Sequence, residues 1–218
     1  MWNSQVIIML LEGIRDTLYM TLASTLFGYI IGLPMGIVLT VTDKDGIRPN
    51  TAVYKVLDVI SNLLRSIPFI ILLIVLIPFT RFVVGRSYGS TAIVPLTIAA
   101  APYIARMVES SLKEVDAGVI EAARSMGASD FQIVTKVMLV EARTSLIVGA
   151  TISLGTILGY SAMAGTVGGG GLGDIAIRYG YTRWQTDIMV VTVVLLVILF
   201  QIFQTIGMKI ANRLDRRK

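Results

Sequence analysis

The chain has 218 residues, of which 55% are apolar and only 15% charged, and its net charge is +5. A water-soluble domain of this length could hardly bury so much apolar surface in one core, so we expect lipid to be its main solvent. The sequence contains no histidine and no cysteine. This excludes imidazole acid–base chemistry, thiol nucleophiles, disulfides and the common zinc ligand sets, so we expect no metal site.

The positive charge could suggest a nucleic-acid partner. The basic residues, however, do not alternate with aromatic ones, and five of them lie within the last ten positions. A position at an anionic membrane surface explains them better, so we expect lipid rather than nucleic acid as the partner. The N-terminus lacks a basic stretch, and the apolar run at residues 6–11 is too short for a signal peptide, so no cleavage is expected.

A membrane-spanning helix needs about 20 mostly apolar residues. The uncharged stretches predict five such helices in a single transmembrane domain, at about residues 17–42, 55–80, 88–106, 144–164 and 188–208. The second is the weakest, because only 15 uncharged residues separate Arg65 from Arg81. That helix would have to begin near Tyr54 and carry Arg65 close to its cytoplasmic end. The predicted fold class is an all-α polytopic membrane protein.

The lysines and arginines in the loops predict the orientation. If the N-terminus lies outside, the cytoplasmic segments hold thirteen basic residues and the outer segments five. Because basic residues favour cytoplasmic loops, we expect an outer N-terminus and a cytoplasmic C-terminus. Trp2, Tyr181 and Trp184 would then lie at the outer membrane interface.

The predicted cytoplasmic loop, residues 107–143, has a helical pattern of its own. An apolar stripe at i, i+3, i+4 and i+7 predicts a short helix, formed by Val119, Ala122, Ala123 and Met126. Gly127 suits the C-terminal end of this helix, where a left-handed conformation is often needed. The loop therefore turns a corner at this glycine.

A second short helix follows the corner. Ser129 and Gln132 match a capping box, which would open a helix with Phe131, Val134 and Met138 on one side. A helix with small residues on one side and charges on the other suits docking by a neighbouring protein. An amphipathic helix that lies on the membrane is the alternative.

The linear pattern favours docking. Glu121, Ala122 and Ala123, with Gly127 six positions after the glutamate, resemble the EAA motif of binding-protein-dependent ABC importer permeases. The resemblance implies that this helix is a coupling helix seated in a cleft of a nucleotide-binding subunit. The motif usually ends in proline where this chain has Val140. Because valine has a free φ and an N–H donor, the second helix is expected to run straighter.

Other stretches resemble the methionine-importer permeases more narrowly, and together they cover nearly the whole chain: residues 64–72, 101–109 and 159–164, the last leading into 168–173. The resemblance implies a type I ABC importer permease fold in the bacterial cytoplasmic (inner) membrane. It also implies a homodimer, two cytoplasmic ATPase subunits that bind ATP and Mg, and an extracytoplasmic methionine-binding protein. L- or D-methionine would cross by ATP-driven alternating access.

The glycine run from Gly165 to Gly173 could suggest a phosphate-binding loop. No Lys-Ser or Lys-Thr pair follows it, so the interpretation fails and we expect neither an ATP site nor a cofactor in this chain. ATP hydrolysis would belong to a separate subunit, and the chain itself would not be an enzyme. The run is better interpreted as an irregular, closely packed outer loop.

Two residues of the second predicted span carry structural predictions. Pro68 within a helix would free the carbonyl of Leu64 and kink the chain, although prolines are also simply tolerated in membrane helices. Arg65, one turn earlier, is costly near a bilayer centre, so it should reach the interface, cap a freed carbonyl or pair with a carboxylate such as Glu109.

Small residues thin the end of the fourth span around Met163. Two copies of such a helix would approach closely, and Met163 from each could close a narrow, dry constriction. The family resemblance implies that this methionine lies at the translocation gate. Tyr160 and Ser161 are polar neighbours in the sequence that could line the same path. The alternative is a methionine that fills a gap between helices.

Two alternative functions can be compared from sequence alone, of which a self-sufficient transporter is the stronger and a membrane-embedded hydrolase the weaker. A self-sufficient channel or secondary transporter could use Arg65 or Glu109 to carry coupling ions. A membrane-embedded hydrolase would need a histidine or a pair of intramembrane carboxylates, and no predicted span contains such a pair.

Overall fold

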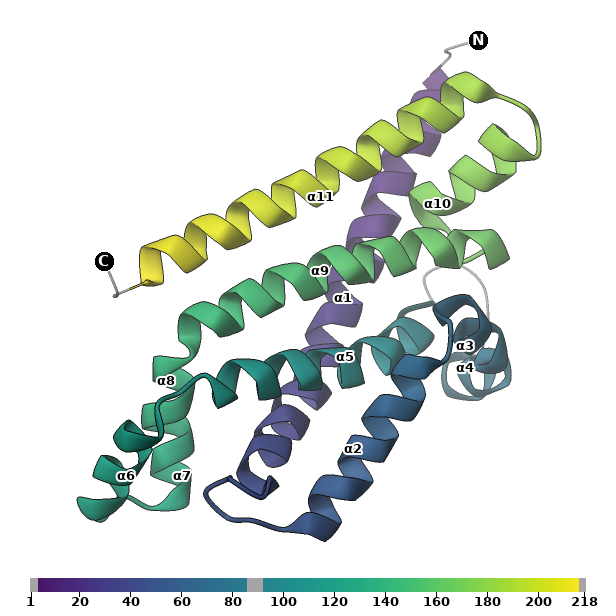
Figure 1. Cartoon of the computed structure of the whole chain (residues 1–218). Helices are drawn as coiled ribbons and strands as arrows, with labels where there is room; N and C mark the ends of the chain where they lie inside the picture. The colour runs from purple at the N-terminus through teal and green to yellow at the C-terminus, as the bar shows by residue number, and fades with distance from the viewer. Residues whose placement is uncertain (1–3, 86–91, 216–218) are drawn as a thin grey trace. The chain divides into compact units, whose positions relative to one another are not determined.

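The computed structural model describes residues 4–85 and 92–215, and within these residues every regular element is a helix (Figure 1). The four longest are α1 (Ser4–Thr42), α5 (Ile93–Lys113), α9 (Arg143–Ala164) and α11 (Thr186–Leu214). The shorter α-helices are α2 (Thr51–Ser66), α3 (Phe69–Val75), α4 (Ile77–Val84), α6 (Ala117–Ser125), α7 (Asp130–Gln132), α8 (Leu139–Glu141) and α10 (Gly171–Ile175). Two π-helices, η2 (Ile133–Met138) and η4 (Ala176–Tyr181), and a 3-10 turn, η3 (Gly165–Val167), complete the described chain.

Three of the helices are long and apolar enough to cross a membrane: α1, α9 together with η3, and α11. They contain the predicted segments 17–42, 144–164 and 188–208. Helix α1 begins earlier than predicted and has 39 residues, which corresponds to about 58 Å at 1.5 Å per residue. That length exceeds the ~30 Å hydrocarbon core of a bilayer, so α1 extends beyond the apolar layer.

The second predicted segment, 55–80, is not one kinked helix. Helix α2 ends at Ser66 and α3 begins at Phe69, with Pro68 in an extended conformation (φ −54°, ψ 131°) as the N-cap of α3. The carbonyl of Pro68 accepts hydrogen bonds from Ile71 and Leu72. Proline disfavours a helical conformation in the residue before it, so the chain breaks there. Helices α2 and α3 together form a bent pair that could serve as a fourth span.

The third predicted segment, 88–106, lies partly outside the described residues, because 86–91 are not among them. Helix α5 covers the rest and continues to Lys113, so its last two turns contain Arg106, Glu109 and Lys113. Trp2 and the last three residues of the basic tail also lie outside the described residues. The count of five spans and the single domain stay predictions.

The described chain packs into two compact units, and each of the four longest helices contributes residues to both. Unit 1 consists of Met1–Phe27, Ile67–Ala100 and Leu154–Gln204, and unit 2 of Gly28–Ser66, Ala101–Ser153 and Thr205–Lys218. The candidate gate lies in unit 1, and the predicted coupling loop lies in unit 2.

The glycine run is closely packed within unit 1. A Cβ at Gly173 would collide with the backbone carbonyl of Ala162, and Gly168, Gly170 and Gly171 have positive φ. The backbone N–H of Leu172 donates to Thr17 Oγ1 at 2.8 Å. The structure therefore confirms a closely packed glycine segment. Its positive-φ glycines and the hydrogen bond from the Gly168 N–H to the Gly165 carbonyl suit a turn.

Unit 2 brings α1 and α5 into close contact through two glycines one helical turn apart. A Cβ on Gly32 would lie 2.6 Å from the carbonyl oxygen of Ala101, and one on Gly36 would lie 2.5 Å from that of Ala105. Small residues allow such close approach between membrane helices. This contact fixes the register of the C-terminal half of α5, which carries most of the charged groups discussed below.

Candidate coupling surface, gate and charge network

Helix α6 has defined caps at both ends. The Asp116 side chain accepts a hydrogen bond from the Gly118 N–H at 2.8 Å, which satisfies one of the free donors of the first turn. The helix gives way to Gly127, whose φ of +83° is the left-handed conformation expected at this position. The capping box of Ser129 and Gln132 is also present, with both reciprocal hydrogen bonds. These local predictions are confirmed.

The helix after the corner differs from the prediction. Instead of a straight α-helix, the chain forms the single α-turn α7, the π-helix η2 and the single α-turn α8 before it ends at Ala142. Val134 and Met138 are buried, but Phe131 is 77% exposed and does not join them. The predicted one-sided stripe of this helix is therefore wrong at Phe131.

The stripe on α6 is also divided. Ala123 is buried against the rest of unit 2, whereas Glu121 and Ala122 are exposed and Met126 is 83% exposed. We call the exposed set the α6 corner: Glu121, Ala122, Met126, Gly127 and Phe131. The corner presents two large apolar side chains to the outside of the protomer, and exposed apolar surface of this kind is typical of a protein contact.

A second contact holds α6 to the loop that follows α1. Arg124 donates from Nη2 to the carbonyl oxygen of Ile47 at 2.6 Å. A cleft of about 420 Å³ lies between this loop, the end of α5 and α6, and both Glu121 and Lys113 line it. In the described part of the chain Glu121 makes no ion pair, so its carboxylate remains available to a neighbouring protein.

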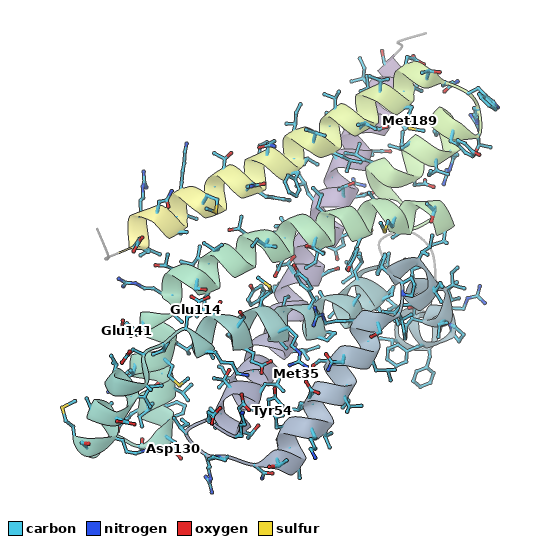
Figure 2. The ribbon with its side chains drawn as sticks, viewed as in Figure 1. Met35, Tyr54, Glu114, Asp130, Glu141 and Met189 are labelled. Carbon is cyan, nitrogen blue, oxygen red and sulfur yellow. The ribbon has the colours of Figure 1, made fainter. Side chains whose placement is uncertain are left out.

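The last two turns of α5 form a network of ionised groups with α2 and the end of α1. We call it the charge network: Asp43, Asp58, Arg106, Glu109 and Lys113. Glu109 is at its centre, with a side chain only 5% exposed, and it accepts from Arg106 Nη1 at 2.7 Å and from Lys113 Nζ at 2.8 Å. Tyr54, labelled on α2 in Figure 2, donates from its hydroxyl to the same carboxylate at 3.2 Å.

Each of the two cations also reaches a second carboxylate. Arg106 hydrogen-bonds to Asp58 on α2, and Lys113 pairs with Asp43 at 2.6 Å. Burial alone would lower the pKa of Lys113, but the hydrogen bonds to Asp43 and Glu109 outweigh it, so the pKa lies above its ordinary value. The same Lys113 contact lowers the pKa of Asp43. Asp43 and Lys113 are therefore both ionised near neutral pH.

The predicted gate residues lie at the end of α9 in unit 1. Met163 is 49% exposed, and a side chain at Gly159, one turn before it, would meet no other atom of the protomer within 4 Å. Ser161 is buried, donates to the carbonyl of Leu158 at 2.7 Å and accepts from Thr21 at 3.4 Å. The ring of Tyr160 stacks on Phe69 at 4.4 Å. Tyr160 and Ser161 thus hold the helix end, while Gly159 and Met163 form its open face.

Arg65 and Pro68 lie apart from the groups with which they were expected to interact. Arg65 is an exposed residue in the last turn of α2, and the described residues contain no ion pair to it. The suggested partner Glu109 is bound to Arg106 and Lys113 instead. Pro68 caps α3 rather than kinking a helix. The suggested pairing of Arg65 with Glu109 is therefore wrong, and the disturbance predicted at Pro68 is a break between α2 and α3 rather than a kink within one helix.

Sequence reasoning missed the charge network, although a signal was present. Tyr54, Asp58 and Asn62 recur every four residues on α2, and Arg106, Glu109 and Lys113 recur at i, i+3 and i+7 on α5. Each set forms one polar stripe along its helix. The complementary charges of the two stripes could have predicted that α2 and α5 pack against each other along them.

Comparison with known proteins agrees with this geometry. Residues 19–218 match the family described as binding-protein-dependent transport system inner membrane component. The chain is 48% identical over 210 residues to a probable D-methionine transport system permease protein, MetI, of Vibrio cholerae, covering 96% of this chain and 93% of that one. The corresponding Escherichia coli K12 protein is 54% identical over 158 residues, or 72% and 73% of the two chains.

Solved structures show the fold. A chain of the methionine ABC transporter MetNI, in an inward-facing conformation, superposes with a TM-score of 0.97 at 49% identity and covers 99% of this chain and 100% of that one. An amino acid ABC transporter superposes with a TM-score of 0.78 at 20% identity, which shows a shared fold alone. The expected type I importer permease fold is thus present. The chain belongs to the family of binding-protein-dependent transport system inner membrane components, as a membrane-spanning permease subunit of an ABC importer.

Proposed function

We propose that this permease imports methionine, as the L- or D-enantiomer, across the bacterial cytoplasmic membrane. The relatives named above are described as D-methionine permeases, and the similar MetNI structure is described as a methionine transporter. Two copies of the chain form the pore, two cytoplasmic ABC ATPase subunits bind ATP and Mg, and an extracytoplasmic binding protein delivers the cargo. The N-terminus lies outside and the C-terminus in the cytoplasm, in keeping with the distribution of basic residues.

The observation that carries the ATPase contact is the α6 corner. Met126 and Phe131 are 83% and 77% exposed, whereas Ile133, Val134 and Met138 of the same loop are buried and Val119 and Val140 are only 43% and 45% exposed. An exposed pair of large apolar groups beside small Ala122 fits a cleft on a partner, because the small residue allows close approach. The corner also holds Glu121 and Gly127 of the EAA motif. We therefore assign the corner as the ATPase-docking surface.

The mechanism is alternating access. ATP binding closes the two ATPase subunits, the α6 corners move with them, and the spans rock so that the central path opens toward the binding protein. Hydrolysis returns the path to its inward-facing state. Met163 is the proposed gate, because it is the large apolar group on the open face at the end of α9, where a second copy would approach.

The alternative of an ion-coupled carrier needs a titratable group that is free to exchange ions. Glu109 accepts hydrogen bonds from Arg106, Lys113 and Tyr54, and Arg65 is exposed at the end of α2. Neither arrangement resembles a coupling-ion site. The observations therefore favour the ATP-driven importer.

A cellular uptake assay tests the proposed function. Cells that lack their own methionine importers would express this chain with its ATPase and binding protein, and accumulation of radiolabelled L- and D-methionine would be measured, with another labelled amino acid as control. We expect accumulation of methionine only when all three proteins are present. Equal accumulation of the control amino acid would overturn the cargo assignment, and accumulation without the ATPase would favour an ion-coupled secondary transporter.

A further inference from the structure

The buried carboxylate of Glu109 occupies an unusual position. Its side chain is 5% exposed, and both of its oxygens are bound, one to Arg106 and the other to Lys113 and Tyr54. Burying an ion is costly unless it is paired and hydrogen-bonded on all sides. Removal of one member of such a pair leaves an uncompensated buried charge. Loss of Glu109 would therefore leave Arg106 and Lys113 without their shared carboxylate and Tyr54 without its acceptor.

The partners belong to different segments. Arg106 and Lys113 are on α5 with Glu109, Asp58 and Tyr54 are on α2, and Asp43 directly follows α1. Arg106 also donates to the amide oxygen of Asn62 at 3.1 Å. The charge network thus joins α2, α5 and the loop after α1 through one chain of alternating charges.

The same segments are joined to α6. Only Glu114 and Val115 separate the end of α5 at Lys113 from the N-cap of α6 at Asp116. Such a short connection cannot absorb a large displacement. On its other side α6 is held by the hydrogen bond from Arg124 to Ile47, which lies in the loop after Asp43.

We propose that Glu109 is a positioning residue for transport. Through the charge network it makes the cytoplasmic half of α5, helix α2 and the loop at 43–50 move as one body with the α6 corner. Motion that an ATPase subunit imposes on α6 is then passed to α2 without loss. This inference rests on the proposed function, because it needs an ATPase to move the corner.

Distance measurement between spin labels tests the single-body motion. The chain has no cysteine, so labels attach only where cysteines are introduced. We would place them at Val56 on α2 and Ser125 on α6, both exposed, in one protomer of the assembled transporter. We expect the same α2–α6 distance without nucleotide and with ATP trapped in a hydrolysis-deficient ATPase. In Glu109→Gln the distance should differ between the two states.

Coupling is the second readout. In Glu109→Gln we expect methionine uptake per ATP hydrolysed to fall about fivefold, the low end of typical coupling energies, with the complex still assembled. Glu109→Asp, which keeps the charge, should restore most of it. Glu114→Gln is the matched control, since Glu114 is an exposed carboxylate next to the same helix end and, among the described residues, it accepts a side-chain hydrogen bond from Ser145. It should leave both the distance and the coupling unchanged.

The outcomes separate the two claims. A wild-type distance that changes between states, or a Glu109→Gln transporter with normal coupling, would overturn the positioning role while uptake itself stands. Absence of ATP-driven uptake in the wild type would overturn the proposed function and this inference with it. If Glu109→Gln does not insert stably, Asp43→Asn replaces it, because it breaks the network at a carboxylate nearer the surface, and the same two readouts apply.

Discussion

Lys113 lies 2.6 Å from Asp43 and 2.8 Å from Glu109, so one ammonium group bridges the end of α1 and its own helix. Glu109 lies one helical turn before Lys113, and Asp43 lies far from both in sequence. The ammonium group forms an ion pair with each carboxylate. The loop after α1 is held to the base of α5 in this way, directly beside the α6 corner. The predictions below test this region and the packing that supports it.

The Asp43–Lys113 contact predicts a pH-dependent stability. Asp43 has a pKa below its ordinary 3.8 because Lys113 hydrogen-bonds to its charged form. The contribution of Asp43 to the free energy of unfolding is therefore present above pH 3.8 and is lost as the pH falls through the lowered pKa. Lys113 has a pKa above its ordinary 10.5, so its contribution persists up to that pH and is lost as the pH rises through the raised pKa.

We therefore expect Asp43→Asn to unfold at a lower temperature than the wild type at neutral pH. The difference should shrink once the pH falls below 3.8. Thermal unfolding of the detergent-solubilised protein at a series of pH values measures it, with Asp45→Asn as control, because Asp45 is highly exposed and lies 3.7 Å from Lys44. A difference that stays constant down to the lowest pH would show that Asp43 contributes nothing through its charge.

Replacement of the exposed apolar groups of the α6 corner should weaken ATPase binding. We expect Met126→Glu and Phe131→Glu to insert normally, because neither side chain is packed within the protomer. Each should reduce recovery of the ATPase in co-purification. Trp184→Glu is the matched control, since Trp184 is 85% exposed on the loop before α11. Equal loss in all three variants would mean that the corner is not the docking surface.

Gly127 allows a test of backbone conformation without a steric effect. Its φ is +83°, and a Cβ there would meet no atom within 4 Å. Asparagine tolerates the left-handed conformation, whereas a β-branched side chain should cost about 1–2 kcal/mol. We expect Gly127→Asn to keep ATP-driven uptake and Gly127→Val to lower it while membrane insertion is retained. Identical uptake in both variants would argue against a required turn at this corner.

The glycine contact between α1 and α5 predicts overpacking. Gly36→Ala would place a methyl group 2.5 Å from the Ala105 carbonyl and should destabilise the protein by about 1–3 kcal/mol. Gly149→Ala is the matched control, because its nearest neighbour, Met107 Cε, would lie at an ordinary 3.5 Å. Chemical unfolding in detergent micelles compares the two. Equal stability of both variants would mean that α1 and α5 separate easily at this point.

Local signals in the sequence predicted local structure well. The cap at Gly127 and the box of Ser129 and Gln132 depend on residues within a few positions of one another, and both are present. Helix composition likewise predicted the helices of α1, α9 and α11. At Pro68 the sequence indicated a disturbance, but whether it kinks or ends the helix depends on what each half packs against.

The missed features depend on contacts distant in sequence. Neighbouring predicted spans make Glu109 one possible partner of Arg65, but the register of α5 places it beside Arg106, Lys113 and Tyr54 instead. Phe131 was expected to pack with Val134 and Met138, yet the turn after Gly127 directs it outward. The periodicity of one helix shows which residues share a face, but it does not show which face the rest of the chain covers.

The most direct test of the proposed importer is uptake by proteoliposomes of defined composition. Vesicles would contain the purified chain alone, the chain with its ATPase subunit, or the chain with an ATPase that binds but does not hydrolyse ATP, each supplied with the methionine-binding protein. We predict that radiolabelled methionine accumulates against its gradient only in the second set and only with ATP and Mg on the ATPase side. Methionine entry of equal rate in vesicles that contain the chain alone would contradict the account.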